Sequence, residues 1–201
     1  MNRKTLLLIT VFTEGGLFLS GLLLTGGWKV ELWSGFNISW GSTVYALLLC
    51  LPMLFMLFFV IRSKWATLSR LNNEIDEKIT PIFAQCKFLD LIVIALLAGL
   101  GEELFFRGWL QSTLGNRIGI WAGILIASTI FGFAHYLSPA YAIYAGVTGL
   151  YLGVIYQVSG NLFILVTIHA LYDFIALVYL VGRSKKTGPH GGVTWDEIEK
   201  Q

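Results

Sequence analysis

Long runs of apolar residues, separated by short polar stretches, dominate the pattern along this 201-residue chain. A helix needs roughly 20 residues to cross the hydrocarbon core of a bilayer, and six of the runs come close to this length. The runs lack the alternation of membrane-barrel strands, and helices satisfy their own backbone hydrogen bonds in lipid. We therefore predict an all-α, polytopic transmembrane helix bundle of about six spans: Thr5–Gly26, Val44–Ile61, Phe88–Gln111, Ile118–His135, Tyr141–Val158 and Asn161–Val181.

Composition agrees with this interpretation, because 56% of the residues are hydrophobic and 13% are charged, against about 25% charged in soluble domains. We expect a single membrane domain over residues 1–201, with a polar C-terminal tail at 182–201. The stretch 62–87 mixes both signs of charge and fits an interfacial helix or a solvated linker, of which we favour the linker. The chain is expected to be an integral, multi-pass protein of a bacterial inner membrane, in contact with the lipid bilayer and with no nucleic acid.

Lysines and arginines in the loops predict the orientation, because they are enriched on the cytoplasmic side of membranes. With the N-terminus inside, the inner segments hold 11 of them and the outer segments hold Lys29 and Arg117, while Arg107 lies within a span. An even number of spans then puts the C-terminus inside as well.

Ionisable residues interrupt the third predicted span. Such residues cost about 2.5–3.5 kcal/mol at mid-membrane on insertion scales, so they usually face protein and mark function. Glu103 and Arg107 lie four apart with the acid first, the favoured order for a helical ion pair. Glu102 points about 100° away from Glu103. We expect Arg107 to hold Glu103 and to leave Glu102 available for chemistry.

Two histidines lie in later spans. His135 ends the fourth, and the sixth carries His169 and Asp173 on one face, where Asp173 either fixes the tautomer of His169 or bonds a substrate carbonyl. A lone intramembrane histidine is usually structural, but six polar groups on three helices predict a site, because buried ion pairs seldom offset their desolvation. Glu14, alone in the first span, fits a cavity lining as well as a role in chemistry.

Small residues four apart predict close helix packing in two spans. Gly119, Gly123 and Ala127 lie on the ridge that continues to His135, so we expect this histidine to face protein. The range 149–153 repeats the pattern in the fifth span, with a glycine at each end.

Three motifs in consecutive apolar segments resemble the signatures of the CAAX-protease and bacteriocin-processing (CPBP, or Abi) family of intramembrane proteases, which includes the Ras-converting CAAX endoprotease. The residues that carry the resemblance are Glu102, Glu103 and Arg107 for Glu-Glu-x-x-x-Arg, Phe131 and His135 for Phe-x-x-x-His, and His169 and Asp173 for His-x-x-x-Asn/Asp. The motifs stand in the family's order, within a core of about residues 88–181.

The resemblance implies an intramembrane endopeptidase of the glutamate type that cleaves a membrane-associated or lipidated peptide or protein. By this resemblance Glu102 activates a water with help from His135, while Glu103 and Arg107 shape the site. His169 and Asp173 stabilise the oxyanion, and no cofactor is expected. The alternative is a zinc metalloprotease with Glu102, His135 and His169 as ligands, a familiar zinc set with an open position for water.

Two other classes of function stay open. Buried acids and histidines also form proton relays in transporters, although the chain lacks the matching halves that many transporters have. A non-proteolytic scaffold or immunity protein of the same fold is the other class, because fold does not fix function.

The predicted spans contain one conflict. Straight helices with these bounds place Glu102 about 21 Å above the inner face and His135 about 25 Å below the outer face, in a core about 30 Å thick. The two residues then lie about 15 Å apart in depth. A shared site requires a bend, for which Gly99 and Gly101 are the candidate hinge.

Overall fold

The computed structural model describes residues 1–28 and 35–187, and over these ranges the chain is helical without any strand. The predicted all-α fold is confirmed. The elements, with η for π-helix, are α1 (Arg3–Trp28), α2 (Trp40–Arg62), α3 (Ala66–Glu74), η1 (Ile75–Ile79), α4 (Thr80–Phe83), α5 (Phe88–Glu103), η2 (Leu104–Gln111), α6 (Ser112–Ile118), α7 (Ile120–Ala134), α8 (Pro139–Ser159) and α9 (Leu162–Thr187).

Several of these helices can cross a membrane. Within the described residues, α1, α2, α8 and α9 are long and apolar enough, and the bent pair Ala66–Phe83 and Phe88–Ile118 is a fifth candidate. The remaining apolar helix, α7, has 15 residues, fewer than the roughly 20 that a span needs. Each of the six predicted segments is thus a helix in an integral membrane protein, although the fourth is shorter than predicted.

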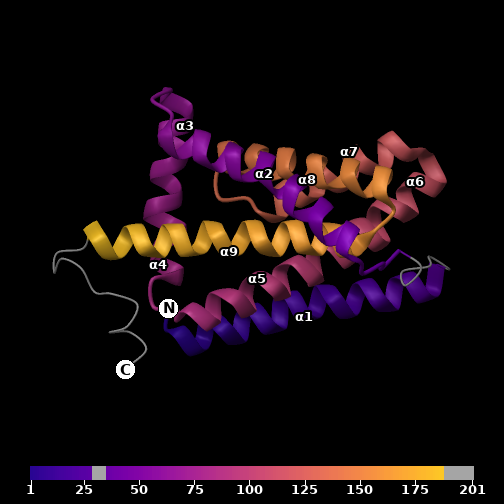
Figure 1. The fold of residues 1–201 in the computed structure, drawn as a ribbon, viewed down its shortest axis with the longest axis horizontal. Helices are drawn as coiled ribbons and strands as arrows, with labels where there is room; N and C mark the ends of the chain where they lie inside the picture. The colour runs from indigo at the N-terminus through magenta and orange to yellow at the C-terminus, as the bar shows by residue number, and fades with distance from the viewer. Residues whose placement is uncertain (29–34, 188–201) are drawn as a thin grey trace.

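Helix α5 lies between α1 and α9 (Figure 1). Two glycines permit this close packing. A Cβ on Gly99 would lie 3.0 Å from the Val166 carbonyl oxygen in α9, and a Cβ on Gly101 would lie 2.5 Å from the Glu14 carbonyl oxygen in α1. Helix α5 continues unbroken through both glycines, so the predicted hinge is wrong.

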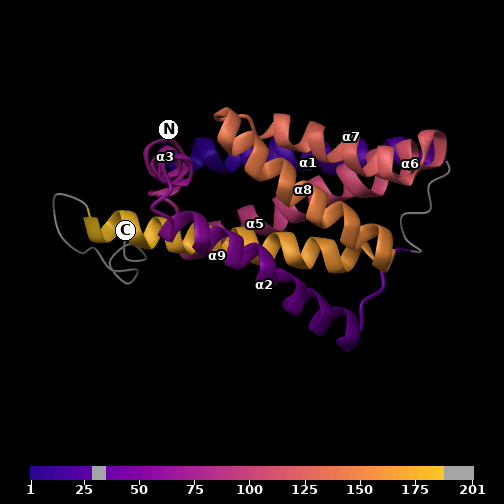
Figure 2. The ribbon, with the colours of Figure 1, turned by 90° about the horizontal axis from the view of Figure 1, so that it is seen from above.

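Helices α7 and α8 pack against each other (Figure 2). A Cβ on Gly132 of α7 would lie 2.6 Å from the Ala142 carbonyl oxygen of α8. Gly123 brings α7 equally close to the preceding helix, because its Cβ would lie 2.6 Å from the Gly115 nitrogen. Gly123 therefore marks a close helix contact, as its spacing predicted, whereas Gly119 lies at a turn with nothing within 4 Å of its Cβ position.

The stretch Ala66–Phe83 forms α3, η1 and α4, so the solvated linker favoured from the sequence is wrong. Its apolar side chains Leu71 and Ile75 are buried in one cluster with Val60 and Leu180. Two of its charged side chains also have partners: Glu74 accepts a hydrogen bond from Ser138, and Asp76 pairs with Arg183. Mixed charge here reflects a helix that packs on one face and bonds neighbouring helices on the other.

The start of α1 and the end of α9 lie at the same end of the bundle (Figure 1). Leu6 is buried in one cluster with Leu177 and Val181, and Arg3 pairs with Asp90 of α5 at 2.5 Å. Helix α9 continues to Thr187, so the tail begins later than the predicted 182. The tail itself, 188–201, lies outside the described residues.

Candidate active site

Glu102 and His135 meet because the helices that carry them form a hairpin around Gly119. Glu102 is 17 residues before Gly119 and His135 is 16 residues after it. The two arms of the hairpin, from Glu102 to Gly119 and from Gly119 to His135, are therefore nearly equal in length, which places the two residues at the same height along the hairpin. Glu102 Oε1 lies 3.6 Å from His135 Nε2. The predicted depth difference is wrong because the third helical run does not end near Gln111: it continues to Ile118, and Gly119 makes the turn with a φ of 99°.

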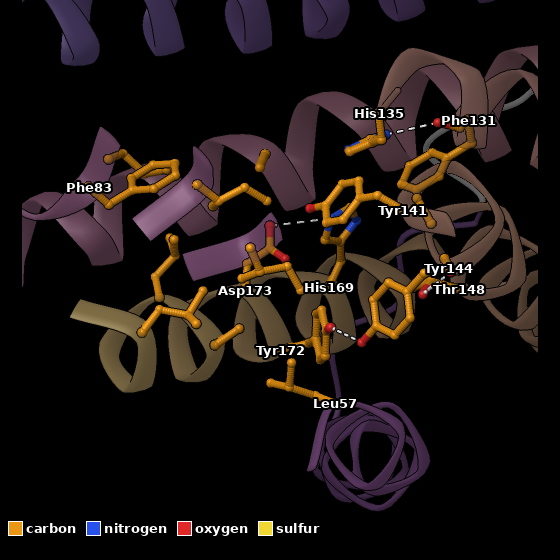
Figure 3. Close-up of a pocket in the computed structure, with 18 of the residues that line it drawn as sticks. Leu57, Phe83, Phe131, His135, Tyr141, Tyr144, Thr148, His169, Tyr172 and Asp173 are labelled. Carbon is orange, nitrogen blue, oxygen red and sulfur yellow. Dashed lines mark hydrogen bonds and ion pairs between the residues drawn. The ribbon is translucent and has the colours of Figure 1, made fainter. Parts of the chain in front are cut away.

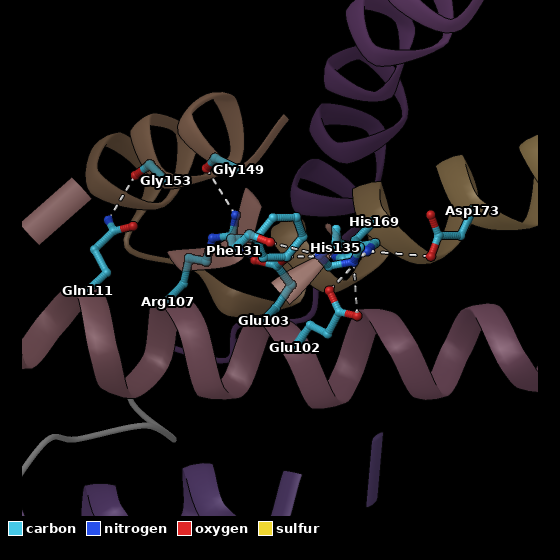
Figure 4. A network of polar contacts seen from close by, with 10 residues as sticks. All are labelled: Glu102, Glu103, Arg107, Gln111, Phe131, His135, Gly149, Gly153, His169 and Asp173. Carbon is cyan, nitrogen blue, oxygen red and sulfur yellow. Dashed lines mark hydrogen bonds and ion pairs between the residues drawn. The ribbon is translucent and has the colours of Figure 1, made fainter. Parts of the chain in front are cut away.

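The predicted ion pair between Glu103 and Arg107 is confirmed. Arg107 Nη1 donates to Glu103 Oε1 at 2.8 Å, with side-chain exposures of 1% and 0%. Arg107 Nη2 donates to the Gly149 carbonyl oxygen of α8 at 2.9 Å. The guanidinium also lies 4.7 Å from the ring centroid of Phe131, within the range of a cation–π interaction. Arg107 therefore links the helix that carries both glutamates to α7 and α8 (Figure 4).

Gln111 makes a second link one turn further along. Its Nε2 donates to the Gly153 carbonyl oxygen at 2.9 Å. A Cβ on Gly153 would lie 2.8 Å from Gln111 Oε1, and a Cβ on Gly149 would lie 3.4 Å from Arg107 Nη2. The glycines thus make room for two long polar side chains. The analysis of the sequence missed Gln111, although it lies four residues after Arg107, just as the glycines lie four apart.

His169 of α9 is held by Glu103. Its Nδ1 lies 2.7 Å from Glu103 Oε1, and because a carboxylate accepts, Nδ1 carries the hydrogen. Asp173 Oδ2 lies 3.5 Å from His169 Nε2, at the limit for a hydrogen bond. Glu103, rather than Asp173, therefore fixes the ring of His169, and Asp173 faces the other ring nitrogen.

His135 has an equally defined tautomer. Its Nδ1 lies 2.9 Å from the Phe131 carbonyl oxygen, which can only accept, so Nδ1 donates and Nε2 faces Glu102. Glu102 Oε2 lies 3.8 Å from His169 Nε2 and is buried without a hydrogen-bond partner among the described residues. The carboxylate of Glu102 therefore faces the Nε2 atoms of both histidines (Figure 4).

A cavity of about 280 Å³ lies beside this cluster (Figure 3). Its polar lining includes His135, His169, Asp173 and, from α1, Glu14. The rest of the cavity wall is mostly apolar and aromatic. The segment Ala66–Phe83 contributes Ile75, Ile79 and Phe83 to this wall, and helices α8 and α9 contribute the tyrosines Tyr141, Tyr144 and Tyr172. The site therefore combines charged groups with an apolar space large enough for several side-chain-sized groups.

The zinc alternative can be compared with these positions. Both histidines donate through Nδ1 and turn Nε2 toward Glu102, an arrangement common around metal-bound histidines. Across the described ranges, however, no group of three or more His, Cys, Asp or Glu residues is arranged to hold a metal ion. The residue types suit zinc, and the steps proposed below use the chain's own side chains without a metal.

Fold and cluster together define an integral membrane protein with glutamates and histidines gathered between its helices. Residues 84–175 match the family described as Type II CAAX prenyl endopeptidase Rce1-like, which is a protease family. The match covers the motif-bearing part of the chain, and it confirms the resemblance drawn from the three motifs. It includes every predicted site residue from Glu102 to Asp173.

One curated protein that resembles the chain is "Uncharacterized protein YpbD" of Bacillus subtilis (strain 168). The two are 36% identical over 98 residues, which is 47% of this chain and 47% of that protein. The matched part thus spans about half the length of this relative. No solved structure matches the chain.

Proposed function

We propose that this protein is an intramembrane endopeptidase of the glutamate type, acting on a membrane-associated or lipidated peptide in a bacterial inner membrane. The observation that carries the proposal is the convergence of the Glu102 carboxylate on Nε2 of His135, at 3.6 Å, and of His169, at 3.8 Å. The match to a protease family supports the proposal over a transporter or a scaffold.

Glu102 acts as the general base. The attacking water donates one hydrogen bond to Glu102 and another to His135 Nε2. This nitrogen can accept because the ring hydrogen is on Nδ1, which donates to the Phe131 carbonyl oxygen. Glu102 takes a proton as the water oxygen attacks the peptide carbonyl carbon, and later gives this proton to the departing amine nitrogen. Such proton transfer by a positioned side chain typically accelerates a reaction about 10²–10⁴-fold.

His169 and Asp173 stabilise the oxyanion that forms on the carbonyl. With both ring nitrogens protonated, His169 donates Nδ1–H to Glu103 and Nε2–H to the oxyanion, while Asp173 balances the imidazolium charge from 3.5 Å. Preorganised donors in such sites commonly supply about 2.7–4 kcal/mol. Glu103 and Arg107 keep this histidine in place.

Replacing Glu102 tests the proposal. The probe is a farnesylated, internally quenched peptide with a CAAX ending, added to liposomes that contain the full-length protein, beside the same peptide without the lipid. We expect Glu102→Gln to lower kcat about 10²–10⁴-fold because the amide cannot accept the proton. Glu77→Gln, which changes an exposed acid on η1, is the matched control and should cleave at the wild-type rate.

The result also separates the two chemistries that these residues allow. Cleavage by Glu102→Gln at the wild-type rate would contradict the assignment of the base. Stoichiometric zinc in the purified, active protein, together with loss of cleavage in chelator and its return with zinc, would instead establish the metalloprotease mechanism.

A further inference from the structure

Glu14 of α1 lies next to the helix that carries Glu102. A Cβ on Gly101, the residue before Glu102, would lie 2.5 Å from the Glu14 carbonyl oxygen, so the two backbones touch at this level. Glu14 and Thr10, one helical turn apart, both line the cavity. The first helix, which bears none of the three motifs, therefore contributes a carboxylate to the same space as the histidines.

The Glu14 carboxylate has no evident structural role. Its Oε2 is buried, and among the described residues it has no hydrogen-bond partner. Burying an unpaired carboxylate is unfavourable, in lipid above all, and such residues usually face a polar cavity and mark function. Every other acid in the cluster faces a histidine or an arginine, as Glu102, Glu103 and Asp173 do. Glu14 is thus available to bind something that enters the cavity.

The charge of the cavity indicates what that group is. Its described lining contains two carboxylates, Glu14 and Asp173, and no lysine or arginine. The nearby Arg107 is engaged by Glu103 and by the Gly149 carbonyl oxygen. In the proposed mechanism Asp173 is balanced by the His169 imidazolium, so Glu14 is the lining carboxylate left without a counter-charge, and a positively charged group complements it. An ionic hydrogen bond is stronger in such a low-dielectric space than in water.

We propose that Glu14 is a specificity-determining residue that binds a basic side chain of the substrate peptide. The proposal rests on the proposed peptidase function for the identity of the ligand as a peptide. The basic side chain enters the cavity from the bound peptide and donates hydrogen bonds to Glu14, and this contact holds the peptide beside Glu102. A neutral side chain makes no such contact, and an acidic one is repelled.

Matched peptides test this assignment. Lysine, norleucine or glutamate is placed in turn at each position near the cleaved bond of the farnesylated CAAX peptide, other than the farnesylated cysteine. Both Kd and kcat/KM are measured in liposomes. Binding is measured with the Glu102→Gln protein so that no peptide is consumed. At one position at least, the lysine peptide should bind about tenfold or more tighter than the norleucine peptide.

Variants of Glu14 carry the decisive comparison. Glu14→Gln should abolish the preference for lysine, Glu14→Asp should retain part of it, and Glu77→Gln should leave it unchanged. Two results would overturn the proposal. One is equal binding of the lysine and norleucine peptides by the protein that keeps Glu14, and the other is a lysine preference that survives Glu14→Gln in a folded protein. A lysine preference without cleavage by the unmodified protein would retain it and would refute the peptidase function instead.

Discussion

Arg107 shows how a full charge is accommodated inside this bundle. It donates to Glu103 and to the Gly149 carbonyl oxygen, and it lies over the ring of Phe131. Glu103 in turn accepts from His169. The pair therefore joins five helical elements, α5, η2, α7, α8 and α9. Its members depend on each other, because removing either one leaves the other charged and buried.

We predict strong coupling between Arg107 and Glu103. Arg107→Met should lower the free energy of unfolding by about 3–5 kcal/mol, because it leaves the Glu103 charge without its main partner. The double variant Glu103→Gln/Arg107→Met should be more stable than Arg107→Met alone. Unfolding in mixed micelles measures all four members of this double-mutant cycle. Additive losses in the double variant would contradict the coupling.

Helical spacing predicted only part of the residue geometry. Glu103 and Arg107 pair as expected, because both lie on one helix and their separation is set by its pitch. The bond from Glu103 to His169 depends on how α5 packs on α9, and no pattern within a single helix reports that packing. For the same reason the sequence left Asp173 two roles, fixing the tautomer of His169 or bonding a substrate carbonyl, and the first of these falls to Glu103.

At the scale of the element, helix ends were harder to predict than the helices themselves. The third span was predicted to end at Gln111, yet the helical run continues to Ile118. Two of its polar side chains bond within the bundle: Gln111 Nε2 donates to the Gly153 carbonyl oxygen of α8, and Ser112 donates to the Arg107 carbonyl oxygen. Polarity ends a helix at the membrane surface, but here it marks contacts between helices.

The contact between α7 and α8 gives a prediction at this scale. Gly132→Ala should destabilise the protein by about 1–3 kcal/mol, because the added methyl group meets backbone at 2.6 Å and the helices must separate. Gly15→Ala in α1, where nothing lies within 4 Å, is the matched control and should stabilise by up to about 1 kcal/mol through helix propensity. Thermal unfolding in detergent compares the two. Equal effects would show that close packing does not limit residue 132.

For the molecule as a whole, the start of α1 and the end of α9 lie at one end of the bundle, which agrees with the distribution of basic residues. Arg3 and Arg183 each pair with an acid at the end of the bundle where α1 begins and α9 ends (Figure 1). The even number of predicted segments implied this common end. Which side of the membrane it faces is predicted by the excess of lysine and arginine.

We predict that this end is cytoplasmic. A membrane-impermeant maleimide should label Asn116→Cys, exposed near the other end, in intact bacterial cells, and should label exposed Lys64→Cys only after permeabilisation. The native Cys50 and Cys86 are 1% and 0% exposed, so they should contribute little background. The reverse pattern of labelling would invert the orientation.

The hairpin around Gly119 also constrains how the gene can change. A single codon inserted in either arm would rotate the side chains beyond it by about 100° and shift them by about 1.5 Å, which would turn Glu102 or His135 away from the other. A second insertion in the opposite arm would bring the two residues back to the same height, but their side chains would still point away from each other. Insertions and deletions in these arms would therefore separate the two residues even if every residue of the three motifs were kept.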